Sequence, residues 1–361
     1  MFINSNLHPY LKFSTLEQEI KSGKDLFSIF RLVASFMVLF AHAYHIYGIG
    51  VDPLTPVLGI YTGKLAVYIF FSISGFFIVR SAMKRDFYQY VISRVLRIYP
   101  ALIVCNVITV AFIIPIAMGL DWYSFLLSQE AQAYVKINSL LDTLKFTISG
   151  VFENNPDQAI NGSLWTLPVE IRAYIIALLL VMVGATNDKS RYNALLFVSI
   201  LVHLNYPSFF VSIFPIPGAV TLMLYFFFGG ALYINRRYIL ISPLLLVLAA
   251  ALIGFFKDAL SPVLLSALIV YLVVSSGYVI RRFINLELRS DYSYGCYLYA
   301  YPLSQLAYNF MSEYRFSYYL MFVVIVTFVF SFASWHLLEK PINSFSRAKI
   351  FPKINKIVHG T

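Results

Sequence analysis

The sequence predicts an all-α polytopic membrane protein, a single bundle of about ten transmembrane helices with both termini in the cytoplasm. Three observations lead to this fold class. The chain of 361 residues is 60% hydrophobic and only 12% charged, whereas a soluble domain has roughly a quarter of its residues charged. Apolar segments follow one another almost from end to end. Basic residues gather in alternate loops between those segments.

The apolar segments set the positions of the spans, because a helix needs about 20 apolar residues to cross ~30 Å of hydrocarbon. The candidate spans are 28–47, 63–82, 97–118, 168–184, 193–213, 217–234, 238–256, 261–280, 292–310 and 316–338. They divide the chain into a cytoplasmic N-terminal segment (1–27), a transmembrane domain (28–338) and a basic cytoplasmic tail (339–361). One long outer loop, about 119–167, separates the third and fourth spans. The N-terminal segment is too polar for a cleavable signal peptide.

The basic residues predict the orientation of the spans. With residue 1 in the cytoplasm, twenty of the 27 Lys and Arg residues fall on the cytoplasmic side and five on the outer side. This bias is the one that the positive-inside rule describes. Topology therefore explains the net charge of +10, and we expect membrane lipid, not nucleic acid, as a partner.

The first predicted span carries ionisable residues that a lipid-facing helix does not need. Arg31, His42 and His45 interrupt it, and an ionisable group within a span is a functional candidate. Arg31 and His42 are eleven residues apart, so they share one helix face and lie ~16 Å apart along the axis. We expect Arg31 near the cytoplasmic rim and His42 about two-thirds of the way across.

The fourth predicted span brings an acid to the depth of that histidine. The span enters from the outer side after Trp165, which fits an interface anchor, and Pro168, which fits a first helical turn. Glu170 would lie about 7–8 Å below the outer surface, close to the depth of His42. The carboxylate could then hold the imidazole tautomer and steady its cation, while the other ring nitrogen takes a proton. A structural polar pair between helices is the alternative.

Arginines crowd the short cytoplasmic segment between the second and third spans. Arg94 and Arg97 are three residues apart at the expected start of a helix, so their guanidinium groups project to one side. Arginine forks suit phosphate oxygens, and together with Arg31 they predict a site for a phosphate-rich ligand. Membrane anchoring by positive charge is the alternative explanation.

The outer loop, about 119–167, is acidic and rich in apolar and aromatic residues. Loops of this length usually carry function, so we expect it to help select a substrate; a solvated connector is the alternative. The two cysteines, Cys105 and Cys296, lie in apolar segments and have no disulfide or zinc spacing. The six histidines are scattered, so no metal site is expected.

Six motifs carry a family resemblance. Arg31 and His42 form an arginine–ten residues–histidine pattern in the first span. The other motifs are FFSISGFFIV from Phe70, Arg94-Val-Leu-Arg97 before Ile98-Tyr99-Pro100, SLWTLPVEIRAY from Ser163, SYGCYLYAYP before the last span, and Glu339-Lys340-Pro341. Their order and sides resemble the acyltransferase-3 family, the membrane O-acyltransferases that decorate bacterial polysaccharides. The resemblance covers nearly the whole chain.

The resemblance implies an acyl-CoA-dependent O-acyltransferase of the bacterial inner membrane. The donor would be cytosolic acyl-CoA, usually acetyl-CoA. The acceptor would be a hydroxyl of a cell-surface polysaccharide or lipid-linked sugar at the outer face. His42 and Glu170 are then the expected catalytic residues, and Arg31, Arg94 and Arg97 are expected to handle the coenzyme's phosphates.

Four further residues are expected to bind the substrate. They are Trp165, Arg172, Ser74 and Tyr174. Ser74 is expected at a close-packing position and not as an acyl carrier. Arg172 stands where the family commonly has glutamine, and could pair with Glu170 or bind an anionic acceptor. Ala300 stands where the family often has histidine, so any role of that histidine is absent here.

Two other function classes fit parts of the pattern. A secondary transporter would also place His42, Glu170 and Arg172 at depth, with helices interrupted near Pro168 and Pro217. The sequence shows no internal repeat to support it. A non-catalytic membrane component of polysaccharide export is the other alternative. Some family members also carry a soluble domain after the last span; if that domain is needed here, it must come from another protein, such as a partner in polysaccharide assembly.

Overall fold

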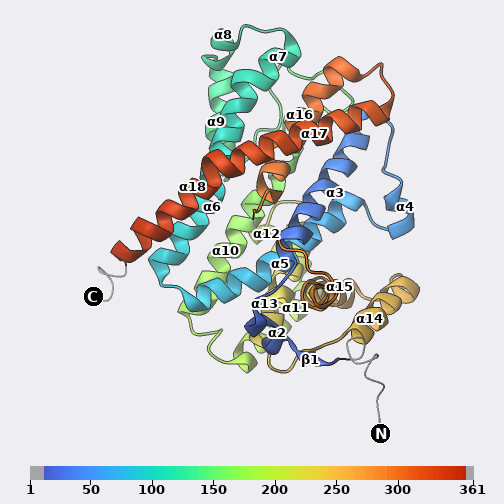
Figure 1. Cartoon of the computed structure of the whole chain (residues 1–361), viewed down its shortest axis with the longest axis vertical. Helices are drawn as coiled ribbons and strands as arrows, with labels where there is room; N and C mark the ends of the chain where they lie inside the picture. Colours follow the sequence, from blue (N-terminus) through green and yellow to red (C-terminus); the bar gives the residue numbers. More distant parts are fainter. Residues whose placement is uncertain (1–11, 289, 355–361) are drawn as a thin grey trace. The chain divides into compact units, whose positions relative to one another are not determined.

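The computed structural model describes residues 12–288 and 290–354, and these residues are mostly helical (Figure 1). Helices lie at all ten positions predicted for spans. They are α3 (Phe27–Tyr47), α5 (Thr62–Lys84), α6 (Phe87–Ile108), α10 (Thr166–Met182), α11 (Lys189–Asn205) with α12 (Pro207–Ile213), α13 (Ala219–Ile234), α14 (Pro243–Phe256), α15 (Pro262–Val279), α16 (Ser293–Met311) and α17 (Phe316–Ser334). The start of the predicted N-terminal segment and the end of the predicted tail, 355–361, lie outside the described residues.

Six of the described helices are long and apolar enough to cross a membrane, or seven if α11 and α12 together make one span. These two helices meet at a bend of 107°, directly before Pro207, which lacks the N–H that a continuous helix would need. Helices α13 and α14 are apolar but shorter. The chain is therefore an all-α membrane protein. Ten crossings and cytoplasmic termini remain predictions.

Two helices extend beyond their predicted spans. Helix α6 begins at Phe87 and not at 97, so Arg94 and Arg97 lie inside it and not at its start. The polar residues of its first turns hide this extension from a search for apolar segments. At the other end of the chain, the helical run that starts with α17 continues without a break to Ile354. The described part of the predicted tail is therefore helical.

The described residues form two compact units, each assembled from segments far apart in the sequence. Unit 1 comprises 12–31, 68–85 and 169–288, and unit 2 comprises 32–67, 86–168 and 290–354. Each unit therefore has its own packing and its own polar contacts.

Unit 1 folds the segment before the first span into its structure. Strand β1 (Ser14–Thr15) pairs antiparallel with β2 (Leu240–Ile241), and α2 (Leu16–Ser22) follows directly. The guanidinium of Arg282 binds the carboxylate of Glu19 at 2.7 Å. The N-terminal segment is thus held by main-chain bonds and by a nearly buried ion pair.

Helices α5 and α13 of unit 1 pack with their backbones almost in contact. A Cβ atom at Gly75 would lie 1.8 Å from the carbonyl oxygen of Phe226, and one at Gly229 would lie 2.4 Å from that of Ser72. Only glycine allows such an approach. The Ser-Gly-Phe motif is therefore a packing motif, although Gly75 and not Ser74 makes the close contact.

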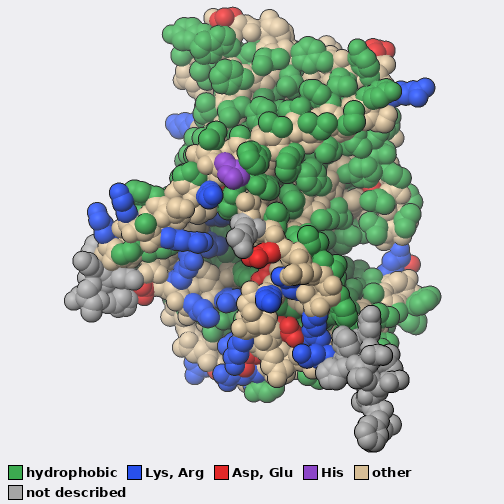
Figure 2. Space-filling view, viewed as in Figure 1, with side chains coloured by type: hydrophobic (Ala, Val, Ile, Leu, Met, Phe, Trp, Pro, Cys, Tyr) green, Lys and Arg blue, Asp and Glu red, His purple; other side chains and the backbone are tan. Residues whose placement is uncertain are grey.

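Unit 2 is built around α16, which packs along α17 (Figure 1). Almost every residue of α16 from Ser293 to Gln305 is buried. Helix α17 instead exposes a stripe of large apolar side chains: Met321, Phe322, Ile325, Phe328, Val329 and Phe332. A continuous apolar stripe on a long helix is expected to meet lipid. Figure 2 shows apolar side chains covering much of the face in view.

The outer loop of unit 2 is a folded region with its own small core. It contains α8 (Trp122–Leu126), α9 (Gln129–Leu140) and the short 3-10 helix η2 (Gly162–Trp165). Its apolar side chains pack together with those of the helix end before it, in a cluster of Val110, Ile114, Ala131, Tyr134, Ile148, Val151, Phe152 and Ile160. The loop is therefore not a simple solvated connector.

Candidate active site

Helix α3 carries His42, as predicted, and unit 2 places its imidazole against a tyrosine ring. His42 is half-buried, and its ring centre lies 4.9 Å from that of Tyr301 on α16, at 65° between the planes. An edge-to-face contact of this kind favours one ring orientation. The position of the imidazole is therefore linked to that of Tyr301.

The segment between the third and fourth predicted spans brings a carboxylate, that of Asp157, to the same tyrosine. The hydroxyl of Tyr301 donates a hydrogen bond to Oδ2 of Asp157. The same oxygen lies 3.2 Å from Nε2 of His45, one turn after His42 on α3. Two histidines, a tyrosine and a carboxylate thus meet at one place.

A buried amide fixes the backbone that carries Asp157. Nε2 of Gln305 donates to the carbonyl oxygens of Asp157 and Ala159, both at 2.7 Å. The side-chain oxygen of Gln305 in turn accepts a hydrogen bond from Asn155 at 2.8 Å. Gln305 is fully buried, so losing these partners would be costly. The loop is therefore fastened directly to α16.

A proline inside α16 supplies a second point of attachment. Pro302 has no N–H, so the carbonyl of Leu298, four residues earlier, loses its helical partner. The side-chain amide of Asn161 donates to this carbonyl at 2.9 Å, and the thiol of Cys105 lies within 3.5 Å of it. The Tyr-Pro pair of α16 thus creates the acceptor that the loop uses.

Close contact also restricts the Tyr301 ring. A Cβ atom at Gly162 would lie 2.6 Å from that ring, so only glycine leaves room for it. Beside the cluster, burial raises the pKa of Tyr61 to about 12, and the carboxylates of Asp52 and Asp157 add to the shift. The Tyr61 phenol therefore keeps its proton at any physiological pH.

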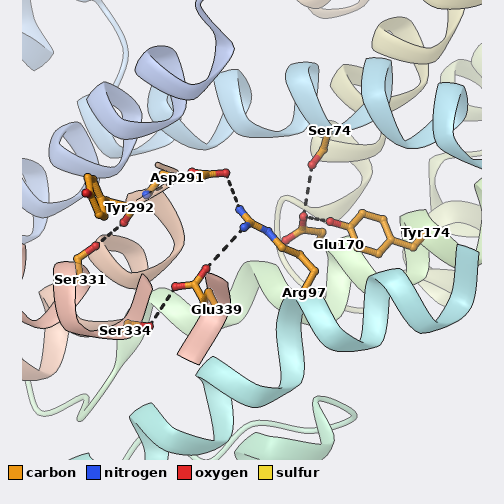
Figure 3. Close-up of polar contacts among 10 residues, drawn as sticks. Ser74, Arg97, Glu170, Tyr174, Asp291, Tyr292, Ser331, Ser334 and Glu339 are labelled. Carbon is orange, nitrogen blue, oxygen red and sulfur yellow. Dashed lines mark hydrogen bonds and ion pairs between the residues drawn. The ribbon is translucent and has the colours of Figure 1, made fainter. Parts of the chain in front are cut away.

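Arg97 of α6 is the centre of a second polar cluster in unit 2 (Figure 3). Its guanidinium lies 2.9 Å from a carboxylate oxygen of Asp291 and 3.6 Å from one of Glu339. Ser334 donates to the other oxygen of Glu339 at 3.0 Å, and Ser293 donates to Asp291 at 2.5 Å. Two carboxylates thus occupy a guanidinium that we predicted to bind phosphate, and that role remains a prediction.

Arg94 has different surroundings. It lies three residues before Arg97 on α6 and is half-buried. Its guanidinium lies 5.8 Å from the centre of the Tyr90 ring, and its Nε donates to Ser93 at 3.3 Å. The predicted partner Arg31 lies at the start of α3, in unit 1.

Unit 1 brings together three of the predicted site residues (Figure 3). The carboxylate of Glu170 accepts hydrogen bonds from the hydroxyl of Tyr174, one turn later on α10, and from Ser74 of α5 at 3.3 Å. Glu170 is thus held in a fixed orientation. Glu170 belongs to unit 1 and His42 to unit 2, and the two units are described separately. The predicted pair of His42 and Glu170 therefore remains a prediction.

Arg172 and Trp165 have few polar contacts. The Nη1 atom of Arg172 is buried, and among the described residues it has no hydrogen-bond partner. No ion pair joins Arg172 to Glu170 in the described part of the chain, so that alternative finds no support. Trp165 ends η2 and is half-buried. Its expected role as an interface anchor remains a prediction.

Four residues of these clusters were not among the predicted site residues: Asp157, Tyr301, Asp291 and Glu339. Asp291 and Glu339 lie at the ends of the last two predicted spans, where an acid within or beside an apolar segment is a usable signal. Asp157 has only a weak signal, because an acid in a polar turn is ordinary. Both cysteines are free and buried. Within residues 12–288 and 290–354, no group of three or more His, Cys, Asp or Glu side chains could hold a metal ion.

Comparison with known proteins identifies the family. The family profile described as an acyltransferase domain matches residues 27–336. The chain belongs to the acyltransferase-3 family. An O-acetyl transferase of Shigella phage Sf6 is 30% identical over 348 residues, which cover 90% of this chain and 98% of the relative. Nodulation protein 10 of Rhizobium leguminosarum bv. viciae is 28% identical over 323 residues, 78% and 83% of the two chains.

Membership of the acyltransferase-3 family confirms the resemblance read from the six motifs and makes the chain an acyltransferase. The family match begins at the first residue of α3 and ends just before Glu339. It therefore includes His42, Asp157 and Tyr301. No solved structure matches the chain.

Proposed function

We propose that this acyltransferase transfers an acetyl group from cytosolic acetyl-CoA to a hydroxyl of a cell-surface polysaccharide or a lipid-linked sugar. The transfer takes place in the bacterial inner membrane, with the acceptor at the outer face. The observation that carries the proposal is a histidine on a membrane helix, His42, in a chain that resembles an O-acetyl transferase over almost its whole length.

The donor is proposed to approach from the cytoplasmic end of α3. Arg31 lies in the first turns of this helix and His42 eleven residues later, which corresponds to ~16 Å of helical rise. The pantetheine arm of the coenzyme can cover such a distance. Phosphates bound near Arg31 would therefore leave the thioester close to His42.

Three arginines are proposed to bind the coenzyme's phosphates: Arg31, Arg94 and Arg97. Guanidinium forks suit phosphate oxygens, and this chemistry fits the donor. Arg97 already lies between Asp291 and Glu339, so a phosphate would have to share it with them. We therefore expect Arg94 to contribute more to donor affinity than Arg97.

The acceptor is proposed to bind at the outer end of α3 and α10, beside the folded outer loop. Trp165 would stack against a sugar ring, and Arg172 would meet an anionic group of the acceptor. The Nη1 atom of Arg172 is buried and has no hydrogen-bond partner among the residues that the structure describes, which supports this role. Ser74 and Tyr174 are proposed to act through Glu170, whose carboxylate they hold.

The proposed reaction uses His42 as the general base, with Glu170 steadying the imidazolium. His42 takes the proton of the acceptor hydroxyl as its oxygen attacks the thioester carbonyl. The carbon–sulfur bond then breaks, and the imidazolium returns the proton to the thiolate. The products are an acetyl ester and free coenzyme A, and no external acid or base is consumed.

Purified protein in lipid nanodiscs provides the test. We expect thiol release from acetyl-CoA labelled in its acetyl group, and incorporation of the label into surface polysaccharide isolated from cells that lack the gene. His42→Ala should lower the rate by roughly 10²- to 10⁴-fold, the range for loss of a general base, and leave membrane insertion intact. His203→Ala, on α11, is the matched control and should retain activity.

Near-normal transfer by His42→Ala would show that the proposed mechanism is wrong. Proton-coupled flux in proteoliposomes without coenzyme release would favour a transporter instead. Mass spectrometry of surface glycans from cells with and without the gene would identify the acceptor, and an unchanged acetylation pattern would contradict a glycan acceptor.

A further inference from the structure

The contact between His42 and the Asp157–Tyr301 pair is not used by the reaction as proposed above. All three residues lie in unit 2. Asp157 comes from the outer loop, Tyr301 from α16 and His42 from α3. Three segments that are distant in the sequence therefore place a carboxylate, a phenol and an imidazole next to one another.

The Tyr301 ring is held at three places. Its hydroxyl donates to Asp157, one part of the ring lies against Gly162 so closely that no Cβ fits, and the ring packs against His42. Tyr301 is also buried, so it cannot turn towards solvent. A ring fixed in this way determines where the imidazole can lie.

The carboxylate at the end of this chain of contacts is fixed as well. Gln305 holds the main chain on both sides of it, at Asp157 and Ala159. Asn161 holds the same loop segment to Leu298. The main chain that carries Asp157 is therefore held in place by hydrogen bonds to α16.

Packing alone does not account for this arrangement. A phenylalanine against a neutral side chain would fill the same space without placing a charge in a largely buried site, where charge is costly. A negative charge near an imidazole, by contrast, stabilises the cation that a general base becomes. The Tyr301 ring links the two groups, since its hydroxyl donates to Asp157 and the ring packs against His42.

We infer that Asp157 and Tyr301 are positioning residues for the catalytic imidazole of His42. Tyr301 fixes the ring, and Asp157 fixes Tyr301 and supplies the compensating charge. This inference rests on the proposed function, in which His42 is the base. It adds to Glu170 a second carboxylate that acts on the imidazole, from within the same unit as the histidine.

Kinetics of three variants test the inference. Tyr301→Phe keeps the ring and removes the hydrogen bond to Asp157, while Asp157→Asn keeps a hydrogen-bond acceptor and removes the charge. Each should lower kcat roughly 10- to 100-fold, the cost of a misplaced catalytic group, with the KM for acetyl-CoA within about twofold of wild type. The double variant should be no slower than the slower single variant, because both changes remove the same Tyr301–Asp157 interaction.

Tyr319→Phe is the matched control. Tyr319 is a buried tyrosine of α17 whose hydroxyl donates to the carbonyl of Ser304 at 3.2 Å. Like Tyr301→Phe, it removes a hydrogen bond donated by a buried phenol, here to a neutral carbonyl and not to a carboxylate, so it should lower thermal stability somewhat less and keep a wild-type kcat. An equal loss of kcat in both variants would mean that only structure is involved, and would overturn the inference.

The outcomes separate the inference from the proposed function. Loss of activity in His42→Ala together with wild-type kcat in Tyr301→Phe or Asp157→Asn would reject the positioning role alone. Activity retained in His42→Ala would reject both. If Tyr301→Phe does not fold, Asp157→Asn and Asp157→Glu decide the question: the first should lose rate, and the second should recover part of it by restoring the carboxylate.

Discussion

The two polar clusters of unit 2 both join carboxylates to basic side chains, but they differ in exposure. In the Arg97 cluster, the exposed fractions of the Arg97, Asp291 and Glu339 side chains are 26%, 14% and 5%, and the cation lies between the two acids. In the Asp157 cluster, the partner His45 is 62% exposed and Asp157 itself 17%. The carboxylates of the first cluster are largely enclosed around one cation, whereas the second cluster joins an exposed histidine to a half-buried imidazole. We take the second cluster as the better candidate for catalysis, because it is accessible and contains a potential general base.

The largest effect is expected from opening the closed cluster. Arg97→Ala leaves Asp291 and Glu339 buried without the cation between them, so it should lower the free energy of unfolding by about 3 kcal/mol or more. Thermal unfolding followed with a thiol-reactive dye measures this, because Cys105 and Cys296 are buried in the folded protein. Arg94→Ala, on the same helix, should cost less than about 1 kcal/mol. Equal losses would remove the distinction between the two arginines.

The next effect concerns the space around Tyr301. Gly162→Ala introduces a methyl group 2.6 Å from the Tyr301 ring, so the ring must shift and its contact with His42 must change. We expect kcat to fall roughly 100-fold, as for other small displacements of catalytic groups. Gly254→Ala is the control, since nothing lies within 4 Å of the added atom. Unchanged activity in Gly162→Ala would show that the ring position does not matter.

The affinity for acetyl-CoA is expected to depend more on Arg94 than on Arg97, the reverse of their order in stability. Arg94→Ala should raise the KM for acetyl-CoA about tenfold, the effect of one lost charge-assisted hydrogen bond, and leave kcat unchanged. The dependence of initial rate on acetyl-CoA concentration gives both constants. An unchanged KM would exclude Arg94 from the donor site and leave its charge to membrane anchoring.

A smaller effect is expected where the loop meets α16. Asn161→Ala removes the hydrogen bond from the side-chain amide to the Leu298 carbonyl, which has no helical partner because of Pro302. The loss should lower the free energy of unfolding by about 1–2 kcal/mol. Asn193→Ala breaks only an exposed pair with Asn235 and should cost about 0.5 kcal/mol or less. Thermal unfolding of both variants compares them. Similar values would mean that the proline carbonyl does not fasten the loop.

The smallest effect is expected at the exposed end of the second cluster. His45→Gln removes the ion pair with Asp157, but a pair with one largely exposed partner contributes at most about 0.5–1 kcal/mol. The hydrogen bond from Tyr301 to Asp157 remains. We therefore expect kcat within about threefold of wild type and little change in stability. A loss as large as that of Asp157→Asn would move His45 from the rim into the catalytic machinery.

The sequence predicted the helices well and their contacts poorly, for a physical reason. Apolar length decides where a membrane helix lies, so a helix was found at every predicted position. The start of α6 was misplaced because its first turns are polar and carry no hydropathy signal. His42 stands out in the sequence as a candidate because an ionisable group inside a span is costly. Asp157 does not, because its contact is with Tyr301, which is 144 residues away in the sequence.

The Leu298 carbonyl, which accepts from Asn161 because Pro302 removes its helical partner, has a consequence for protein engineering. Hydrogen bonds of Asn161 and Gln305 hold residues 155–162 of the loop to α16, so a loop grafted from a relative would need this segment. A chimera that retains residues 155–162 would keep these hydrogen bonds, whereas a chimera that replaces this segment would lose them. Because the acceptor is proposed to bind beside this loop, we expect the chimera that retains this segment to take on the acceptor preference of the relative.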